Sequence, residues 1–358
     1  MSDSSLNIDN ILIQISNNQN VSDIHIASGS RISFRLNWEI KKIDKFPELT
    51  EEMVEYMLRQ LMKGNQKMYE EFASNKEADF SYIANDGTPF RVNAFFKLWK
   101  IWIVLRKINS EALPLEKLVF QDVAENLKKN VLSKKHWLFL VTWPTWSGKS
   151  TSLIAMLEHI NQNRPDHIIT IEDPIEFVFK EKKSIVSQRE IWHDTWHFMN
   201  ALRAAMREDP DVVLVWEIRD KETAEAVLNL AETWHLVFST LHTSSASGTI
   251  NRFISFFPPA IQDSIADRLA EILAGVKSQR LMKTSDWRWR VGMYEIMINT
   301  SAVRNNIKKR QLAQVDNIIE TWMKQWMYTL QQYAQRLIQE GFITEEAVSW
   351  LFKTKSSG

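Results

Sequence analysis

The chain has 358 residues, enough for two or three domains with a sizeable core. Lysine plus arginine and aspartate plus glutamate each number 44, so the overall charge gives no bias toward nucleic acid or an anionic membrane. The lack of cysteine excludes disulfides, thiol nucleophiles and cysteine-ligated metals. No apolar run approaches the ~18–20 residues that span a bilayer, so we expect an intracellular protein without a transmembrane segment.

The N-terminal part of the chain combines strand and helix patterns. Apolar and polar residues alternate within 24–36 and 80–96, which predicts half-buried strands. Thr50 precedes an apolar pattern of helical spacing and is the expected N-cap. We therefore expect a small α+β domain at 1–108, followed by a linker at 109–115.

Farther along the chain, short apolar runs alternate with helical patterns. The runs lie at 137–142, 212–215 and 236–240, and each is typical of a strand buried on both faces of a parallel sheet. The alternation predicts an α/β core at 116–300. A mostly helical region is expected at 301–358.

The first of these strands leads into part of a phosphate-binding motif. The full motif, Gly-x-x-x-x-Gly-Lys-Ser/Thr, lies between a strand and a helix, where backbone N–H groups and the lysine contact phosphate and the hydroxyl binds Mg²⁺. Gly148, Lys149 and Ser150 match, but Trp143 stands at the first glycine. An indole there would obstruct both the turn and the ligand, so the literal motif fails. The alternative is an ordinary loop with a chance Gly-Lys-Ser.

Five ordered blocks resemble the type II/type IV secretion ATPase superfamily. With glycine at positions 143 and 146, the phosphate loop would read Gly-Pro-Thr-Gly-Ser-Gly-Lys-Ser-Thr, as in that family. The other blocks resemble, in the family's order, its opening N-terminal strand, Asp box, Walker B region and His box: residues 22–26, 170–177, 207–220 and 232–243. The resemblance covers nearly the whole chain. It implies an α/β protein with a PAS-like N-terminal domain, a RecA-like P-loop ATPase domain and a helical C-terminal region.

The resemblance also implies how ATP and Mg²⁺ would be held. Lys149 would contact the β- and γ-phosphates, Ser150 would bind Mg²⁺, and Glu217 would contact the water shell of the metal. Glu176 would align the attacking water, although it could instead be a surface carboxylate in a proline-bearing loop. The loop residues that would surround the nucleotide are Pro144, Thr145, Ser147, Gly148, Lys149, Ser150 and Thr151.

Histidines and arginines complete the implied catalytic set. His235 and His242 flank a buried strand and would sense nucleotide across a subunit boundary, or would only form strand-end hydrogen bonds. Arg91 and Arg106 would be arginine fingers supplied to a neighbouring subunit, or solvated strand residues. Arg219 could equally form an internal salt bridge. A zinc site is not expected from two histidines without cysteine.

The implied function is an ATP-hydrolysing homohexameric motor for type IV pilus retraction and twitching motility. It would be cytoplasmic and would attach to the inner membrane through a pilus platform protein. Assembly and secretion members usually have extra N-terminal domains and a four-cysteine insertion, which favours the retraction branch here. Residues 302–307 resemble the C-terminal motif of that branch, although Asn306 replaces a usual apolar residue.

Several alternatives to the retraction motor stay open. They are an accessory retraction ATPase, another secretion ATPase, and a ring subunit that does not hydrolyse ATP. A DNA motor is disfavoured by the neutral charge balance, so no nucleic-acid partner is expected.

Tryptophan is unusually common in the chain and glycine unusually rare. There are 15 tryptophans and only 9 glycines, about 2.5% glycine against an ordinary value of about 7%. Trp143, Trp146, Trp216 and Trp234 occupy the blocks where the family has glycine. Either these tryptophans are genuine and the loop cannot hold ATP, or most or all are glycines misread from UGA, which some bacteria decode as glycine. The second hypothesis explains their positions better.

Overall fold

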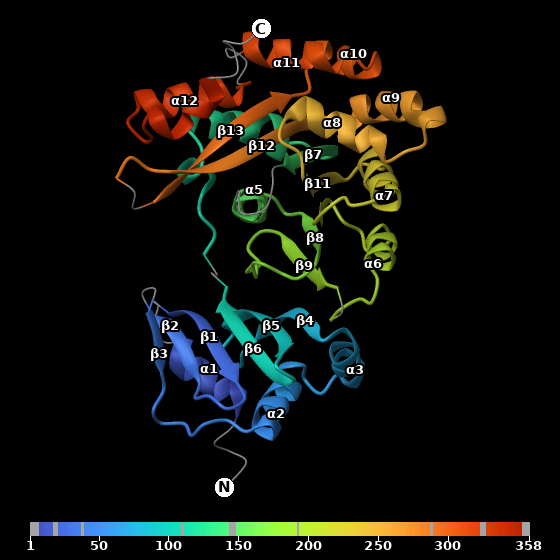
Figure 1. Ribbon diagram of the computed structural model, residues 1–358. Helices are drawn as coiled ribbons and strands as arrows, with labels where there is room; N and C mark the ends of the chain where they lie inside the picture. The colour runs from blue at the N-terminus through green and yellow to red at the C-terminus, as the bar shows by residue number, and fades with distance from the viewer. Residues whose placement is uncertain are drawn as a thin grey trace. The chain divides into compact units, whose positions relative to one another are not determined.

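The computed structural model describes residues 7–16, 21–36, 39–108, 111–142, 148–191, 193–286, 289–322 and 327–352. The chain forms two compact units (Figure 1). The first contains Met1–Glu111, Glu172–Phe179 and Gln188–His197, and the second contains Ala112–Ile171, Lys180–Ser187 and Phe198–Gly358. The division expected from the sequence, with boundaries after residues 108, 115 and 300, stays a prediction.

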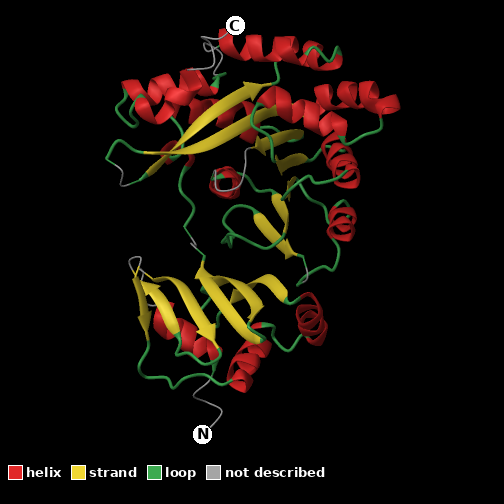
Figure 2. Ribbon diagram, viewed as in Figure 1, coloured by secondary structure: helices red, strands yellow, loops and turns green. Residues whose placement is uncertain are grey.

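The first unit contains a six-stranded sheet in the order β3-β2-β1-β6-β5-β4, with antiparallel neighbours (Figure 2). The elements are α1 (Ile8–Ser16), β1 (Val21–Ala27), β2 (Ser33–Leu36), β3 (Glu39–Lys42), α2 (Glu51–Leu61), α3 (Gln66–Asn75), β4 (Glu77–Ile83), β5 (Pro89–Lys97) and β6 (Lys100–Lys107). Buried apolar side chains from the three helices and from the sheet form one core. Thr50 caps α2, because its hydroxyl accepts a hydrogen bond from the Met53 N–H at 3.3 Å. The predicted α+β character is confirmed, whereas the PAS-like assignment stays a prediction.

The second sheet has seven strands in the order β13-β12-β7-β11-β10-β8-β9. Strands β12, β7, β11, β10 and β8 run parallel to one another, and β13 pairs antiparallel with β12. The strands are β7 (Trp137–Thr142), β8 (His167–Glu172), β9 (Ile185–Glu190), β10 (Val212–Val215), β11 (Leu236–Leu241), β12 (Leu273–Lys283) and β13 (Arg290–Ile298). The three predicted buried strands are confirmed as β7, β10 and β11.

Helices of the second unit accompany this sheet in the upper part of Figure 2. They are α4 (Gln121–Leu127), α5 (Lys149–Asn163), α6 (Phe198–Ala205), α7 (Lys221–Glu232), α8 (Ala246–Ser255), α9 (Gln262–Ile272), α10 (Ser301–Lys308), α11 (Leu312–Thr321), α12 (Leu330–Gln339) and α13 (Ser349–Phe352). A π-helical segment at Lys128–Leu132 extends α4, and short 3-10 turns lie at Leu115–Lys117, Pro259–Ile261 and Glu346–Val348. The predicted helical C-terminal region is confirmed over its described residues.

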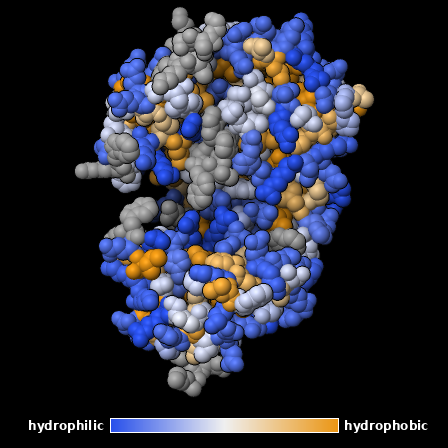
Figure 3. Space-filling view, in the orientation of Figure 1, coloured by the Kyte–Doolittle hydropathy of each residue, from blue (hydrophilic) through white to orange (hydrophobic). Residues whose placement is uncertain are grey.

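The surface seen in Figure 3 is mostly hydrophilic, with apolar residues in small separate patches. Across the described part of the chain, no helix combines the length and the apolar character that crossing a membrane requires.

Among the described residues, three tryptophans have a positive φ, a backbone conformation that favours glycine: Trp99, Trp234 and, with φ 151°, Trp137. Leu98 and Trp99 form the two-residue loop of the β5–β6 hairpin, with φ of 50° and 69°, and such loops favour Asn-Gly. Trp234 has φ 70° and directly follows Thr233, the C-cap of α7, where glycine is the usual residue. Both indoles are solvent-exposed, Trp99 by 94% and Trp234 by 74%. The Trp234 ring does lie 4.6 Å from that of His136, but burial does not explain why either position carries an aromatic side chain.

Candidate nucleotide site

The last residues of the predicted phosphate loop begin α5. Gly148 has φ 81° and is the N-cap, a left-handed conformation that suits glycine. Lys149, Ser150 and Thr151 form the first turn of this 15-residue helix. The free N–H groups and the dipole at its N-terminus favour an anion. Five loop residues lie outside the described part of the chain: Trp143, Pro144, Thr145, Trp146 and Ser147.

Lys149, His242 and Glu217 meet at the carboxyl edge of the parallel strands. Lys149 Nζ lies 3.4 Å from His242 Nδ1, and His242 Nε2 lies 3.1 Å from Glu217 Oε1. An ammonium only donates and a carboxylate only accepts. The hydrogen-bond pattern therefore assigns the neutral tautomer of His242, which accepts from Lys149 at Nδ1 and donates from Nε2 to Glu217.

Burial and two neighbouring positive charges favour the neutral form of the His242 ring. Burial lowers the pKa of His242 below its ordinary value of 6.5, and the positive charges of Lys149 and Arg219 act in the same direction. Glu217 opposes this shift. Arg219 Nε also donates to Glu217 Oε2 at 3.0 Å, which is the internal salt bridge that the sequence left as an alternative.

Arg91 and Glu176 form a second group, within the first unit. Arg91 Nη1 lies 3.4 Å from Glu176 Oε1, and Arg91 Nε donates to Asp79 Oδ1 at 3.1 Å. Asp79 is the main cause of the raised pKa of Arg91, and Glu176 adds to it. The Arg91 guanidinium therefore contacts both Asp79 of β4 and Glu176, the carboxylate expected to align the attacking water.

Arg106 is the register partner of Arg91 in the antiparallel pair β5–β6. Directly opposite residues in such a pair project from the same face of the sheet. Arg106 Nε donates to Asp23 Oδ1 at 2.8 Å, while its side chain is 60% exposed. The structure thus brings the two candidate arginines together, and gives each a different carboxylate partner.

His235 lies apart from the Lys149 group. It precedes β11 whereas His242 follows it, so the two histidines lie at opposite ends of this six-residue strand. His235 Nδ1 lies 2.9 Å from the carbonyl oxygen of Leu230. This contact favours the strand-end hydrogen bond over a role at the nucleotide.

Glu190 is a buried carboxylate beside the Asp box that the sequence did not single out. Its Oε1 accepts from the Ser81 N–H at 2.8 Å, and its Oε2 accepts from the Ile175 N–H at 2.9 Å. Burial raises the pKa of Glu190. Ile175 directly precedes Glu176, so Glu190 fixes the backbone that carries Glu176.

A row of hydroxyls, also missed from the sequence, links the end of β7 to the loop after β11. Thr142 Oγ1 lies 2.9 Å from Ser278 Oγ and 3.3 Å from Thr249 Oγ1. Thr249 Oγ1 lies 2.6 Å from Thr243 Oγ1, next to His242. The strand that leads into the phosphate loop is thereby tied to the segment that carries His242.

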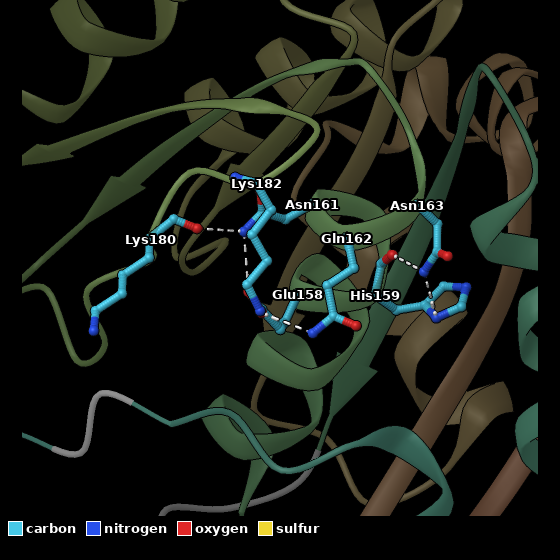
Figure 4. Close-up of polar contacts among 7 residues, drawn as sticks. All are labelled: Glu158, His159, Asn161, Gln162, Asn163, Lys180 and Lys182. Atoms are coloured by element: carbon cyan, nitrogen blue, oxygen red, sulfur yellow. Dashed lines mark hydrogen bonds and ion pairs between the residues drawn. The ribbon is translucent and has the colours of Figure 1, made fainter.

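The opposite end of α5 carries a separate polar group (Figure 4). Asn161 Nδ2 donates to the Lys180 carbonyl at 2.8 Å, and Lys182 forms an ion pair with Glu158. Gln162 Nε2 also donates to Glu158, at 2.9 Å. These contacts attach the segment before β9 to the C-terminal half of α5, away from Lys149.

Comparisons with known proteins show the family of the chain. Residues 5–349 match the family model for type II/IV secretion system protein. The chain is 42% identical over 318 residues to a twitching motility protein of Neisseria gonorrhoeae, covering 87% of this chain and 82% of the relative. It is 41% identical over 336 residues to the type IV pilus retraction ATPase PilT of Pseudomonas aeruginosa, covering 94% and 95%. A crystal structure of the pilus retraction motor PilT with bound ADP superposes with a TM-score of 0.84 and 40% identity, covering 95% of both chains. The chain therefore belongs to the type II/IV secretion system protein family.

Proposed function

We propose that this chain is a P-loop ATPase, converting ATP and water to ADP and phosphate, that powers type IV pilus retraction. The observation that carries the proposal is the Lys149–His242–Glu217 group beside the N-terminus of α5. The similarity to PilT proteins over nearly the whole chain supports the same reading.

Residues of the second unit would bind the nucleotide. The N–H groups of the first turn of α5 donate to phosphate oxygens, and the Lys149 ammonium turns from His242 to the β- and γ-phosphates. The Ser150 hydroxyl and the Glu217 carboxylate offer the oxygen donors that Mg²⁺ prefers, with Glu217 acting through water. The bound metal would neutralise charge on the phosphates.

We assign the remaining steps to residues of the first unit. Glu176 orients the attacking water through its carboxylate, and Arg91 and Arg106, supplied to a neighbouring subunit, stabilise the charge that develops on the transferred phosphoryl group.

The proposal extends to the assembly and its location. The chain would act as a cytoplasmic homohexamer, bound peripherally at the inner membrane through a pilus platform protein. An accessory retraction ATPase would have the same site and is the alternative within this class.

The tryptophans decide whether the chain as written is active. We propose that Trp143 and Trp146 are glycine in the native protein, and the left-handed backbone at Trp99 and Trp234 supports this reading. Codons that read UGA at these positions would agree with the proposal, and UGG would contradict it. If the tryptophans are genuine, they favour a ring subunit that does not hydrolyse ATP.

Mg²⁺-dependent ATP hydrolysis tests the proposed function. It should be measured for the chain as written and for the double variant Trp143→Gly/Trp146→Gly. We expect hydrolysis in the double variant and little or none in the original chain. If neither protein hydrolyses ATP while both have folded circular dichroism spectra, the motor proposal is wrong.

A further inference from the structure

A buried lysine lies behind the start of α5. Lys277 of β12 has a fully buried side chain. Its Nζ donates to Ser152 Oγ at 2.8 Å and lies 4.1 Å from the centre of the Tyr294 ring. Both of these partners are uncharged at pH 7, since burial raises the pKa of Tyr294. Burial of a lysine against neutral partners costs folding free energy, so we expect a role of Lys277 beyond packing.

Ser152 forms hydrogen bonds with both Lys277 and a second β12 residue, Gln279. Ser152 Oγ donates to Gln279 Oε1 at 2.7 Å. Because a hydroxyl has a single proton, Ser152 must accept from Lys277, and the order of the chain is Lys277 to Ser152 to Gln279. Ser152 lies in the first turns of α5, two residues after Ser150.

Gln279 in turn lies against the last glycine of the phosphate loop. A Cβ atom added to Gly148 would lie 3.2 Å from Gln279 Nε2. Lys277 and Gln279 are two residues apart on one strand, so they share a face of β12. Through Ser152 they bond β12 to the beginning of α5, and Gln279 lies beside Gly148.

We propose that Lys277 is a positioning residue for the phosphate loop: through Ser152 and Gln279 it holds Gly148 and the first turn of α5 in the conformation that binds nucleotide phosphate. The inference rests on the proposed nucleotide-binding function. Burial lowers the pKa of Lys277 to about 7. The hydrogen bond to Ser152 survives loss of the charge, because both the ammonium and the neutral amine carry N–H donors.

Amide hydrogen–deuterium exchange of residues 152–155 in the nucleotide-free full chain tests the inference without relying on activity, because these N–H groups bond back to the carbonyls of residues 148–151, as Ser152 does to Gly148. Lys277→Met and Ser152→Ala should each accelerate exchange there about five- to tenfold, the effect of losing one hydrogen bond. Ser152→Thr keeps the hydroxyl and should restore slow exchange. Lys221→Met, at an exposed position in α7, is the matched control and should change nothing.

Nucleotide binding provides the second measurement. In the Trp143→Gly/Trp146→Gly background, Lys277→Met and Ser152→Ala should weaken ADP binding and raise KM for ATP by a similar five- to tenfold, with a smaller change in kcat. Unchanged exchange in both variants would overturn the inference. If Lys277→Met does not fold, the exchange of Ser152→Ala alone tests the inference. If these variants exchange faster while the Trp143→Gly/Trp146→Gly parent hydrolyses no ATP, the inference is supported and only the proposed function is wrong.

Discussion

His242 Nε2 lies 3.1 Å from Glu217 Oε1, while the other nitrogen of the same ring faces Lys149 Nζ at 3.4 Å. The order of the strands explains this bridge. His242 follows β11, which lies between β7, the strand before the phosphate loop, and β10, the strand before Glu217. One imidazole therefore connects the two segments that would hold phosphate and metal.

Removal of this bridge should slow ATP hydrolysis. We expect His242→Ala, in the Trp143→Gly/Trp146→Gly background, to reduce kcat about 10- to 100-fold, because Glu217 loses the hydrogen bond that positions its carboxylate. His235→Ala is the matched control, since that ring lies at the other end of β11. Steady-state phosphate release measures both variants, and equal losses in the two would contradict the assignment.

The acid limit of activity should follow the protonation of His242. Its pKa is lowered from 6.5, so the ring stays neutral to a lower pH than an ordinary histidine. Protonation would remove the acceptor for Lys149 and add a positive charge beside it and Arg219. We expect the acid limb of the kcat/KM profile below pH 6.5, and we expect His242→Gln to remove that limb. If His242→Gln leaves the acid limb of the kcat/KM profile unchanged, the limb reports the protonation of another group.

Glu176 should be needed for hydrolysis and not for binding. Glu176→Gln should reduce kcat about 10²–10⁴-fold, the usual contribution of a positioned general base, with little change in ADP affinity. Parallel hydrolysis and ADP titration experiments distinguish the two effects. Full activity in this variant would show that Glu176 is a surface carboxylate without a role in hydrolysis.

Lys277 should make the stability of the chain depend on pH. Its pKa is about 7 in the folded protein against an ordinary 10.5, so the unfolded state binds more protons between these values and stability rises with pH. Relative to Lys277→Met, the free energy of unfolding should increase by at most about 5 kcal/mol from pH 7 to 10.5. Urea unfolding at several pH values measures this difference, which should be constant below pH 7. A difference that stays constant from pH 7 to 10.5 as well would show that Lys277 keeps an ordinary pKa.

Glycine at the two left-handed tryptophans should stabilise the fold. Trp99→Gly and Trp234→Gly remove an unfavourable backbone conformation, and each should raise the free energy of unfolding by about 1 kcal/mol. Trp102→Gly is the contrast, because Trp102 lies within β6 with its ring 6.4 Å from that of Phe95, and it should destabilise the protein. Urea denaturation of the three variants checks the signs. Destabilisation by all three would argue against glycine at positions 99 and 234.

The buried parallel strands and the ends that carry chemistry were predictable from the sequence. Continuous apolar runs mark β7, β10 and β11, and Lys149, Glu217 and His242 lie in the segments that follow those runs. Parallel strands share an edge, which accounts for the convergence of the three side chains. The structure brings them together.

The β12–β13 hairpin and the supporting residues were not predictable in the same way. Lys277, Ser278 and Gln279 are consecutive polar residues that are nevertheless buried, so β12 has neither an apolar run nor an alternating pattern. Lys277 and Glu190 acquire their roles from partners 125 and 109 residues away in the chain. No local pattern contains such contacts.

The most direct test of the account is the rate of Mg²⁺-dependent phosphate release by the Trp143→Gly/Trp146→Gly chain, with and without Lys149→Ala. We predict sustained ATP hydrolysis by the first protein and its loss in the second, because Lys149 is the phosphate-contacting cation of the site. Hydrolysis that persists in the Lys149→Ala protein, or its absence from a folded parent, would contradict the proposal that this chain is an ATP-driven motor.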